Sequence, residues 1–317
     1  MKILCTQLGR IGDMILDTGA FRILKETHPN AIIDILSSKH NFTIIENNPN
    51  IRKIIIFDKS PIAFAKMIFE LRKTHYDYYI DFKDHYSSES ALLTKFIKAN
   101  IKVGFNKANK RVYDINFTKD ISDTIHFSKK AQLALEKANL IQPSDLDATP
   151  ELIISPIDEQ RFNQFARLFT PDKFVCVNIS ATAATRIMSK EKWKVIINSA
   201  ALFMPVIIIS SPADKEKAES LMGDNIFYYQ TQTVNEIFPV IANSQFLISP
   251  DTSTVHIASA FGKKVFAFYQ LDSYNITRFA PLTKGSVIIT PDEHATPLEG
   301  INNERIVAEL SNFFNNF

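Results

Sequence analysis

Short apolar runs alternate along the chain with segments whose apolar residues recur at helical spacing. Phe64, Met67, Ile68 and Leu71 fall at positions i, i+3, i+4 and i+7, which is one face of a helix. The apolar runs are rich in Val and Ile, as is typical of strands buried on both faces of a parallel sheet. Such strands are predicted at residues 2–8, 31–37, 53–58, 78–82, 174–180, 205–210, 226–230, 246–250, 264–269 and 286–290.

The alternation restarts in the second half of the chain, where helices are predicted near residues 189–202, 213–222, 234–243 and 252–261. Strands that alternate with helices predict an α/β fold with helices on both faces of each sheet. Two doubly wound domains are therefore predicted, residues 1–155 and 156–317. A stretch around 145–172, with several prolines and acids, is expected to join them. The C-terminal helix could pack back on the first domain.

Composition argues against a nucleic-acid-binding, disulfide-linked or membrane-spanning protein. Apolar residues make up 45% and charged residues 22% of the chain, and the formal net charge is +2, so nothing favours nucleic acid as a partner. Cys5 and Cys176 lie inside strand-like runs and are expected to be reduced, buried cysteines of a cytoplasmic protein. No run reaches the roughly 18 apolar residues of a membrane span, and the N-terminus is strand-like rather than a signal peptide.

Ligands of open parallel sheets bind beyond the carboxyl ends of the strands. The first such loop, "GRIGD" at 9–13, lacks the G-x-G-x-x-G pattern, and the next strand ends in Ser37 and Ser38 rather than an acid. A nicotinamide cofactor and a Walker loop are therefore both disfavoured. Asp13 has two interpretations: it stabilises the start of the helix, or it acts as a general base.

The segment "SPDTSTVHIASAFG" at 249–262 carries the strongest signal in the second half. Small hydroxyl residues at the start of a helix leave backbone N–H groups that can bind an anion. His256 follows in the first turn of the same helix. The alternative is structural: Asp251 or Thr252 caps the helix, and His256 packs in the core.

Four motifs together resemble glycosyltransferase family 9, the heptosyltransferases of bacterial lipopolysaccharide synthesis. They are "LGRIGDMILDTGAFRILKETHP", "YYIDFKDHYSSESALL", "ISATAATRIMSKEKW" and "ISPDTSTVHIASAFGKKVFAFY". The resemblance implies a GT-B fold: two Rossmann-like domains with the active site in the cleft between them. It further implies an inverting, metal-independent transfer of heptose from ADP-heptose to a Kdo or heptose of the lipopolysaccharide inner core, without a cofactor.

The resemblance also implies roles for individual residues. Asp13 matches the acid that deprotonates the acceptor hydroxyl, and the residues at 252–254 match the loop that stabilises the departing diphosphate. Arg186 occupies the position of a family lysine on the same diphosphate. An acid near the nucleoside is expected at Glu216, with Asp214 as the alternative. The full donor set is Thr182, Arg186, Glu216, Asp251, Thr252, Ser253, Thr254 and His256.

The segment 90–113 contains no acidic residue. Its basic residues are Lys95, Lys98, Lys102, Lys107, Lys110 and Arg111. Two interpretations remain open: a solvated surface, or a patch that steers a phosphorylated lipid acceptor and contacts the inner face of the cytoplasmic membrane. The acceptor-binding residues expected are Arg10, Lys83, Ser88, Lys107, Lys110 and Arg111.

Three departures from the family pattern leave the exact donor and acceptor open. The segment 178–181 replaces a frequent Pro-Gly-Ala, Ser253 replaces glycine, and Ser87 stands where a basic residue is common. The alternatives are a GT-B transferase that uses another nucleotide sugar for a different surface glycan, and a non-catalytic nucleotide-sugar-binding protein.

Overall fold

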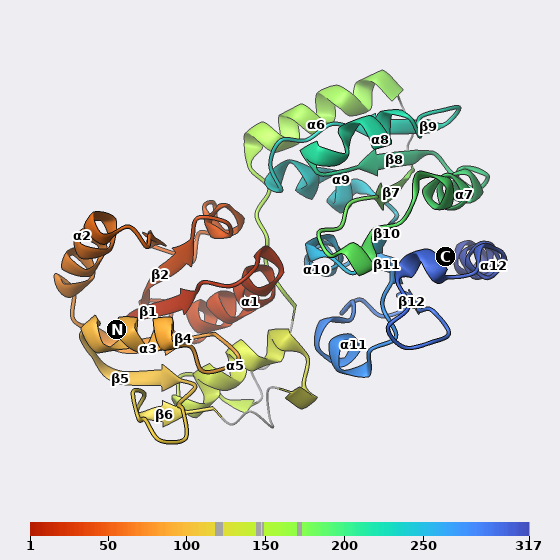
Figure 1. The fold of residues 1–317 in the computed structure, drawn as a ribbon. Coiled ribbons are helices and arrows are strands. Elements are labelled where there is room, and N and C mark those ends of the chain that lie inside the picture. Colours follow the sequence, from red (N-terminus) through yellow and green to blue (C-terminus); the bar gives the residue numbers. More distant parts are fainter. Residues whose placement is uncertain (118–122, 144–146, 148, 170–172, 317) are drawn as a thin grey trace. The chain divides into compact units, whose positions relative to one another are not determined.

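The computed structural model describes residues 1–117, 123–143, 147, 149–169 and 173–316. The chain divides into two compact units, Met1–Ile153 and Ile154–Phe317. Each unit is an α/β layer structure with a sheet of parallel strands (Figure 1).

The sheet of the first unit contains six described strands in the order β3-β2-β1-β4-β5-β6, all of them parallel. This is the strand order of a Rossmann fold, in which the chain reverses its direction of progress between β1 and β4. The strands are β1 (Lys2–Gln7), β2 (Ile32–Ser38), β3 (Lys53–Phe57), β4 (Tyr76–Asp81), β5 (Ala99–Gly104) and β6 (Ile115–Asn116).

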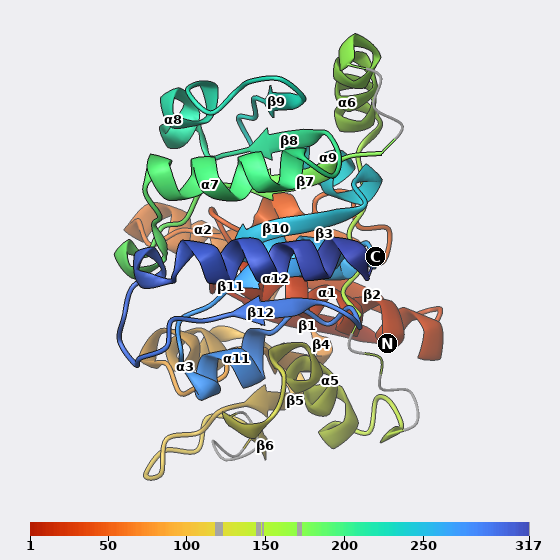
Figure 2. The same ribbon diagram turned by 90° about the vertical axis from the view of Figure 1, so that its right-hand side faces the viewer.

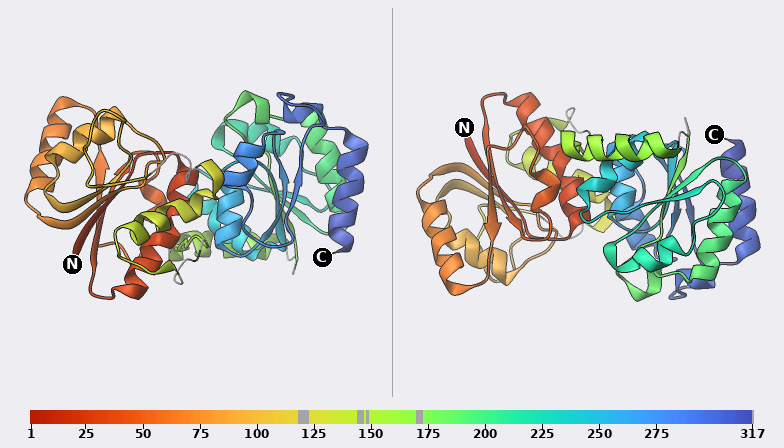
Figure 3. Two further views of the ribbon diagram at one scale, coloured as in Figure 1. Left: turned by 90° about the horizontal axis from the view of Figure 1, so that it is seen from below. Right: turned by 90° about the horizontal axis from the view of Figure 1, so that it is seen from above.

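Helices cover both faces of this sheet, as Figure 3 shows end-on. The helices are α1 (Ile11–Thr27), α2 (Pro61–Arg72), α3 (Ser88–Phe96) and α5 (Phe127–Lys137). On one face, Met67 and Leu71 of α2 and Leu93 of α3 join a core with strand residues such as Tyr79. On the other face, α1 packs against α5.

The second unit repeats this topology. Its six described strands lie in the order β12-β11-β10-β7-β8-β9, so the direction of progress reverses between β7 and β10. All its strand pairs are parallel. The strands are β7 (Val175–Asn178), β8 (Val206–Ile209), β9 (Ile226–Tyr229), β10 (Phe246–Pro250), β11 (Lys264–Phe268) and β12 (Val287–Ile289).

The helices of the second unit are α6 (Pro156–Phe169), α7 (Lys190–Ala201), α8 (Lys215–Glu219), α9 (Phe238–Asn243), α10 (Ser253–Ala260), α11 (Ser273–Phe279) and α12 (Asn303–Asn315). The C-terminal helix α12 lies beside α7 (Figure 2) and buries Ile306, Leu310 and Phe313 in the core of this unit. Phe313 packs edge-on against Phe246 of β10. The apolar face of α12 therefore belongs to the core of the second unit.

Two further differences concern the middle of the chain. β5 is an additional strand within the basic segment 90–113, and β6 is an additional strand that follows this segment. Part of the predicted joining stretch is the helix α6, which packs on α9. Its start is capped by Ser155, whose hydroxyl accepts a hydrogen bond from the Asp158 amide at 3.1 Å. Residues 145, 146, 148 and 170–172 of the joining stretch lie outside the described residues.

The two reversal points are where an open α/β sheet offers room for a ligand, because the loops on either side diverge there. In the first unit these loops follow β1 and β4, and in the second they follow β7 and β10. No helix among the described residues is both long and apolar enough to cross a membrane.

Candidate functional site

The loop after β1 is held by two buried amide side chains. Asn41 donates from Nδ2 to the carbonyl oxygens of Gln7 and Gly9, both at 3.1 Å. The Gln7 side chain accepts a hydrogen bond from the Gly9 amide at 2.9 Å. Because the loop is fixed from two sides, the first turn of α1 starts at a defined place.

Asp13 lies in that first turn and accepts a hydrogen bond from the Arg10 amide at 3.0 Å. Its carboxylate lies directly over Gly9: a Cβ atom at that position would be only 2.4 Å from Asp13 Oδ2. A side chain at position 9 would therefore displace the Asp13 carboxylate from its place over the loop. Both interpretations of Asp13 are compatible with this geometry, since the carboxylate caps the helix and remains half-exposed.

Neighbouring groups shift the pKa of Asp13 in opposite directions. Burial raises the pKa of its carboxyl and nearby Asp84 adds to this rise, whereas the Arg10 amide and the ammonium of Lys130 lower it. Lys130 is a buried residue of α5 that donates to the carbonyl oxygen of Phe82, directly after β4. The net pKa of Asp13 is raised, so the group is a stronger base than an exposed aspartate while Lys130 still favours its ionised form.

Asp17 lies one helical turn after Asp13 and is fully buried. Its Oδ2 accepts a hydrogen bond from Gln7 Nε2, while its Oδ1 has no hydrogen-bond partner among the described residues. Burial raises the pKa of Asp17 to about 8, with Asp13 and Asp84 contributing and with Lys130 and Gln7 opposing. Gln7 thus connects the buried acid Asp17 to the Gly9 loop on which Asp13 rests.

Asp17 makes stability depend on pH in a direction that can be tested. An unfolded aspartate loses its proton near pH 4, whereas folded Asp17 keeps it up to about pH 8. Between these values the folded state binds the extra proton, so the free energy of unfolding falls as pH rises, by at most about 1.4 kcal/mol per pH unit. Above pH 8 Asp17 is ionised in both states, and the stabilisation that its protonated form gives at low pH has been lost.

We expect Asp17→Asn to remove this dependence, because asparagine can still accept the Gln7 hydrogen bond but does not titrate. The calorimetric Tm of the variant should rise relative to the unmodified protein between pH 5 and pH 8. Asp224→Asn, at an exposed position of the second unit, is the matched control and should follow the unmodified protein. Parallel Tm profiles for Asp17→Asn and the unmodified protein would contradict the assignment.

The structure places the expected acceptor residues after the carboxyl ends of three strands of the first sheet. Arg10 follows β1, Lys83 and Ser88 follow β4, and the loop with Lys107, Lys110 and Arg111 follows β5. The parallel strands bring these loops to one edge of the sheet. Lys107 Nζ lies 6.0 Å from the ring of Tyr86, in the β4–α3 loop.

Not every basic residue of the segment 90–113 belongs to a surface patch. Lys102 donates from Nζ to the Thr94 carbonyl oxygen at 2.7 Å, and burial lowers the pKa of its amine. Lys95, Lys98 and the loop residues Lys107, Lys110 and Arg111 are exposed. The basic surface is thus smaller than the sequence suggests.

In the second unit, Asn178 connects the two loops at the reversal point. It is the last residue of β7 and is buried. Its Nδ2 lies 3.1 Å from Ser249 Oγ and from Thr252 Oγ1, and 3.2 Å from Thr254 Oγ1. The hydroxyl-rich loop after β10 is therefore held by the neighbouring strand, across the point where ligands of this fold bind.

The helix α10 begins directly after this loop. Thr252 is its N-cap residue, but the Thr252 side chain makes no capping hydrogen bond to the helix. Its hydroxyl instead lies 2.8 Å from that of Thr254. The start of α10 thus has no side-chain cap from Thr252, and the backbone N–H groups at such a helix start can bind an anion. His256 is buried, with its ring 6.1 Å from that of Phe279, which favours support of the loop over contact with a donor.

Arg186 and Asp251, both expected in the donor site, are paired. One terminal nitrogen of Arg186 lies 2.7 Å from Asp251 Oδ2, and the other donates to the Asp251 carbonyl oxygen at 2.7 Å. Asn275 donates to the same Oδ2 at 2.7 Å. Asp251 therefore orients the arginine, and the guanidinium, which has five N–H donors, retains donors for a ligand.

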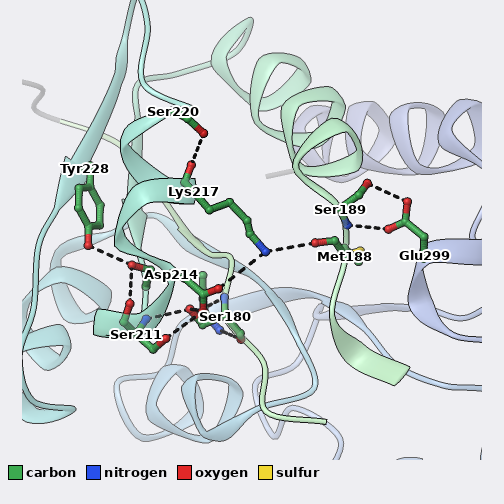
Figure 4. A network of polar contacts seen from close by, with 11 residues as sticks. Ser180, Met188, Ser189, Ser211, Asp214, Lys217, Ser220, Tyr228 and Glu299 are labelled. Carbon is green, nitrogen blue, oxygen red and sulfur yellow. Dashed lines mark hydrogen bonds and ion pairs between the residues drawn. The ribbon is translucent and has the colours of Figure 1, made fainter. Parts of the chain in front are cut away.

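Of the two candidate acids after β8, the structure brings Asp214 into the site rather than Glu216. Asp214 accepts hydrogen bonds from the hydroxyls of Ser180 at 2.6 Å and Ser211 at 2.9 Å (Figure 4). Glu216 lies on the short helix α8, where its side chain is exposed to solvent. Thr182 is exposed in the loop that follows β7.

Four residues that hold the loop after β1 or surround Asp13 escaped the sequence analysis: Gln7, Asp17, Asn41 and Lys130. Asn178 was noted only as part of the departure at 178–181, without its hydrogen bonds to the loop after β10. Asp17 offered the clearest signal, since an acid within the apolar run 14–20 is unusual. No comparable signal marks Lys130, whose role depends on the packing of α5 against α1. Among the described residues, no group of three His, Cys, Asp or Glu side chains is placed to hold a metal ion.

Comparison with known proteins agrees with this geometry. A family model described as glycosyltransferase family 9 (heptosyltransferase) matches residues 64–304. The chain belongs to glycosyltransferase family 9. A curated relative of this family from Escherichia coli K12, named Putative lipopolysaccharide heptosyltransferase 4, is 25% identical over 272 residues, which is 82% of this chain and 71% of that protein.

Two solved structures share the fold along the whole length. A family 9 glycosyltransferase from Veillonella parvula has a TM-score of 0.85 at 17% identity and covers 100% of this chain and 98% of its own. The ADP-heptose lipopolysaccharide heptosyltransferase II of Escherichia coli has a TM-score of 0.78 at 19% identity, with coverage of 100% and 99%. The chain thus has the α/β GT-B fold of these enzymes and is a heptosyltransferase-like glycosyltransferase.

Proposed function

We propose that this protein is an inverting, metal-independent heptosyltransferase. It moves heptose from ADP-L-glycero-D-manno-heptose to a Kdo or heptose of the lipopolysaccharide inner core. The observation that carries the proposal is the position of Asp13: a half-buried carboxylate with a raised pKa, fixed by the Arg10 amide at the reversal point of the first sheet. A general base needs such a fixed position and a pKa shifted toward the working pH.

The reaction is a single displacement. The acceptor hydroxyl oxygen attacks the anomeric carbon of heptose while its proton passes to the Asp13 carboxylate. The bond between that carbon and the diphosphate oxygen breaks, and its electron pair leaves with ADP. Attack from the face opposite the leaving group inverts the anomeric centre. Lys130 helps to keep Asp13 ionised before each turnover.

The second unit is proposed to bind the donor. The N-terminus of α10 and the guanidinium of Arg186 face developing negative charge on the diphosphate, where preorganised donors contribute most to rate. Thr182, Ser253 and the hydroxyls of Thr252 and Thr254 complete this set. Asp214 is proposed for the nucleoside in place of Glu216, because Ser180 and Ser211 hold it in the loops after β7 and β8.

The first unit is proposed to bind the acceptor through Arg10, Lys83, Ser88 and the loop with Lys107, Lys110 and Arg111. Cations at this edge of the sheet suit an acceptor that carries phosphates and carboxylates. The acceptor is part of a lipid, so the protein is proposed to act in the cytoplasm at the inner face of the cytoplasmic membrane. No nucleic acid partner is proposed.

A panel of ADP-, GDP- and UDP-sugars, each with a Kdo-containing inner-core acceptor, tests the donor. We expect transfer with ADP-heptose, the product to have the inverted anomeric configuration by NMR, and the rate to be unchanged by EDTA. Faster transfer from a GDP- or UDP-sugar would replace this proposal by a transferase for another surface glycan. Donor binding without transfer to any acceptor would indicate a nucleotide-sugar-binding protein.

A further inference from the structure

The helix α2 exposes two large apolar side chains on its outward face. Ile62 is 73% exposed and Phe69 is 67% exposed. They are seven residues apart, so they lie on the same face, two turns from one another. The inward face of α2 already contributes Met67 and Leu71 to the core. The exposed pair is therefore a second apolar stripe that the fold of the first unit does not use.

Basic side chains border this stripe. At 100° per residue, Lys66 and Lys73 fall within 40° of Ile62, and Arg72 flanks the stripe on the other side. Lys73 Nζ lies 4.9 Å from the ring centre of Phe69 and also pairs with Glu70. The carboxylates of α2 and α3 pair with other lysines: Glu70 with Lys53 and Lys73, and Glu89 with Lys59.

The neighbouring helix α3 extends the same surface. Leu92 of α3 is 49% exposed, and Lys95 follows it on the solvent side. The two helices lie side by side: Phe64 and Phe96 have ring centres 6.2 Å apart, and Lys59 pairs with Glu89 at 3.1 Å. We define the outer face of α2 and α3 by these residues: Ile62, Lys66, Phe69, Arg72, Lys73, Leu92 and Lys95.

We propose that the outer face of α2 and α3 docks on an anionic lipid bilayer. Ile62, Phe69 and Leu92 would enter the boundary between headgroups and acyl chains, while the lysines and Arg72 contact lipid phosphates. Exposed large apolar side chains surrounded by cations are what an interfacial helix needs, because neither attraction alone holds a protein firmly on a membrane. Each basic residue near an anionic surface strengthens binding by about fivefold.

A second copy of the chain fits this face poorly. A symmetric contact would bring the same patch of both copies together and would place Lys66 and Arg72 near their own counterparts. An anionic bilayer offers the opposite charge to the basic residues of this face, which outnumber the carboxylates Glu70 and Glu89. The stripe also begins at the edge of the sheet that carries the expected acceptor residues, since α2 and α3 start after the carboxyl ends of β3 and β4 (Figure 1).

The docking face rests on the proposed function only in one respect: a lipid acceptor explains why the protein would meet a membrane. It is tested by vesicle co-sedimentation, which requires no transfer of sugar. The full chain is mixed with vesicles of phosphatidylglycerol and phosphatidylethanolamine, or with vesicles of phosphatidylcholine alone. The variant Ile62→Ser/Phe69→Ser is compared with Ile157→Ser/Leu202→Ser, which removes two apolar side chains of the second unit that are 74% and 86% exposed.

We expect the unmodified chain to bind the anionic vesicles and to bind phosphatidylcholine at least tenfold less. Ile62→Ser/Phe69→Ser should weaken binding at least tenfold without lowering the Tm, and Lys66→Glu/Arg72→Glu should do the same. Ile157→Ser/Leu202→Ser should bind normally. Absence of vesicle binding by the unmodified chain, equal losses in the two serine pairs, or dimerisation that depends on Ile62 and Phe69 would overturn the proposal.

Failure here and failure of the proposed function give different results. A chain that transfers heptose to a soluble acceptor but does not bind vesicles overturns only the docking face. A chain that binds vesicles through α2 but transfers no sugar overturns only the assignment as a heptosyltransferase.

Discussion

Asp13→Asn is expected to lower kcat for heptose transfer by about 10²- to 10⁴-fold, the range found when a general base is removed. The loss should fall on kcat because asparagine keeps the shape of the side chain. Its amide oxygen can still accept the hydrogen bond from the Arg10 amide, so the start of α1 should stay intact. Only the ability to take up the acceptor proton is removed.

Two measurements separate this chemical role from a structural one. The affinity for the donor, measured by calorimetry with ADP, should change little, because the donor residues belong to the second unit. The matched control is Asp17→Asn, one helical turn away, which should keep most of the activity because Asp17 is buried and does not reach a substrate. Activity of Asp13→Asn near that of the unmodified protein would exclude Asp13 as the base.

Arg186→Met is expected to lower kcat/KM by about 10²- to 10³-fold, as the removal of one preorganised donor to a developing charge commonly does. A second effect adds to this loss. Asp251 is buried and would lose its ion pair with the guanidinium, although Asn275 still donates to the same Oδ2. Without that cation the buried carboxylate would repel the diphosphate and destabilise the loop after β10.

The double variant Arg186→Met/Asp251→Asn separates these two effects. Removal of both charges should restore the Tm, because the buried carboxylate is removed together with its guanidinium. Activity should stay low, since the diphosphate still lacks the guanidinium. Arg186→Lys should retain part of the activity, because it keeps the charge but not the planar fork. If the double variant regained full activity, Arg186 would serve only to neutralise Asp251.

Much of the fold could be predicted from the sequence because strands buried on both faces are nearly continuous apolar runs. β10 is an example: all of its residues are buried, and its run of Phe, Leu and Ile is plain in the sequence. β5 was missed because only Val103 and Gly104 are buried in it, so its lysine and asparagine hide the strand. The helix α6 was missed because Pro156 suggested a linker, although proline is favoured in the first turn of a helix.

The candidate site could be predicted only where its residues are close in sequence. The loops around Asp13 and at 249–256 could be found because a strand, small residues and a helix follow one another. Asn41, Lys130 and Asn178 act over 30 to more than 70 residues of sequence separation, through contacts that only the folded sheet creates. The choice between Glu216 and Asp214 likewise depended on which of them faces Ser180.

We propose that this protein adds heptose to the lipopolysaccharide inner core and that Asp13 is the base. Mass spectrometry of the inner core from a strain that lacks the protein tests both parts. We expect a core that ends at the acceptor sugar, restored to full length by the unmodified protein but not by Asp13→Asn. A full-length core in the deletion strain, or restoration by Asp13→Asn, would contradict it.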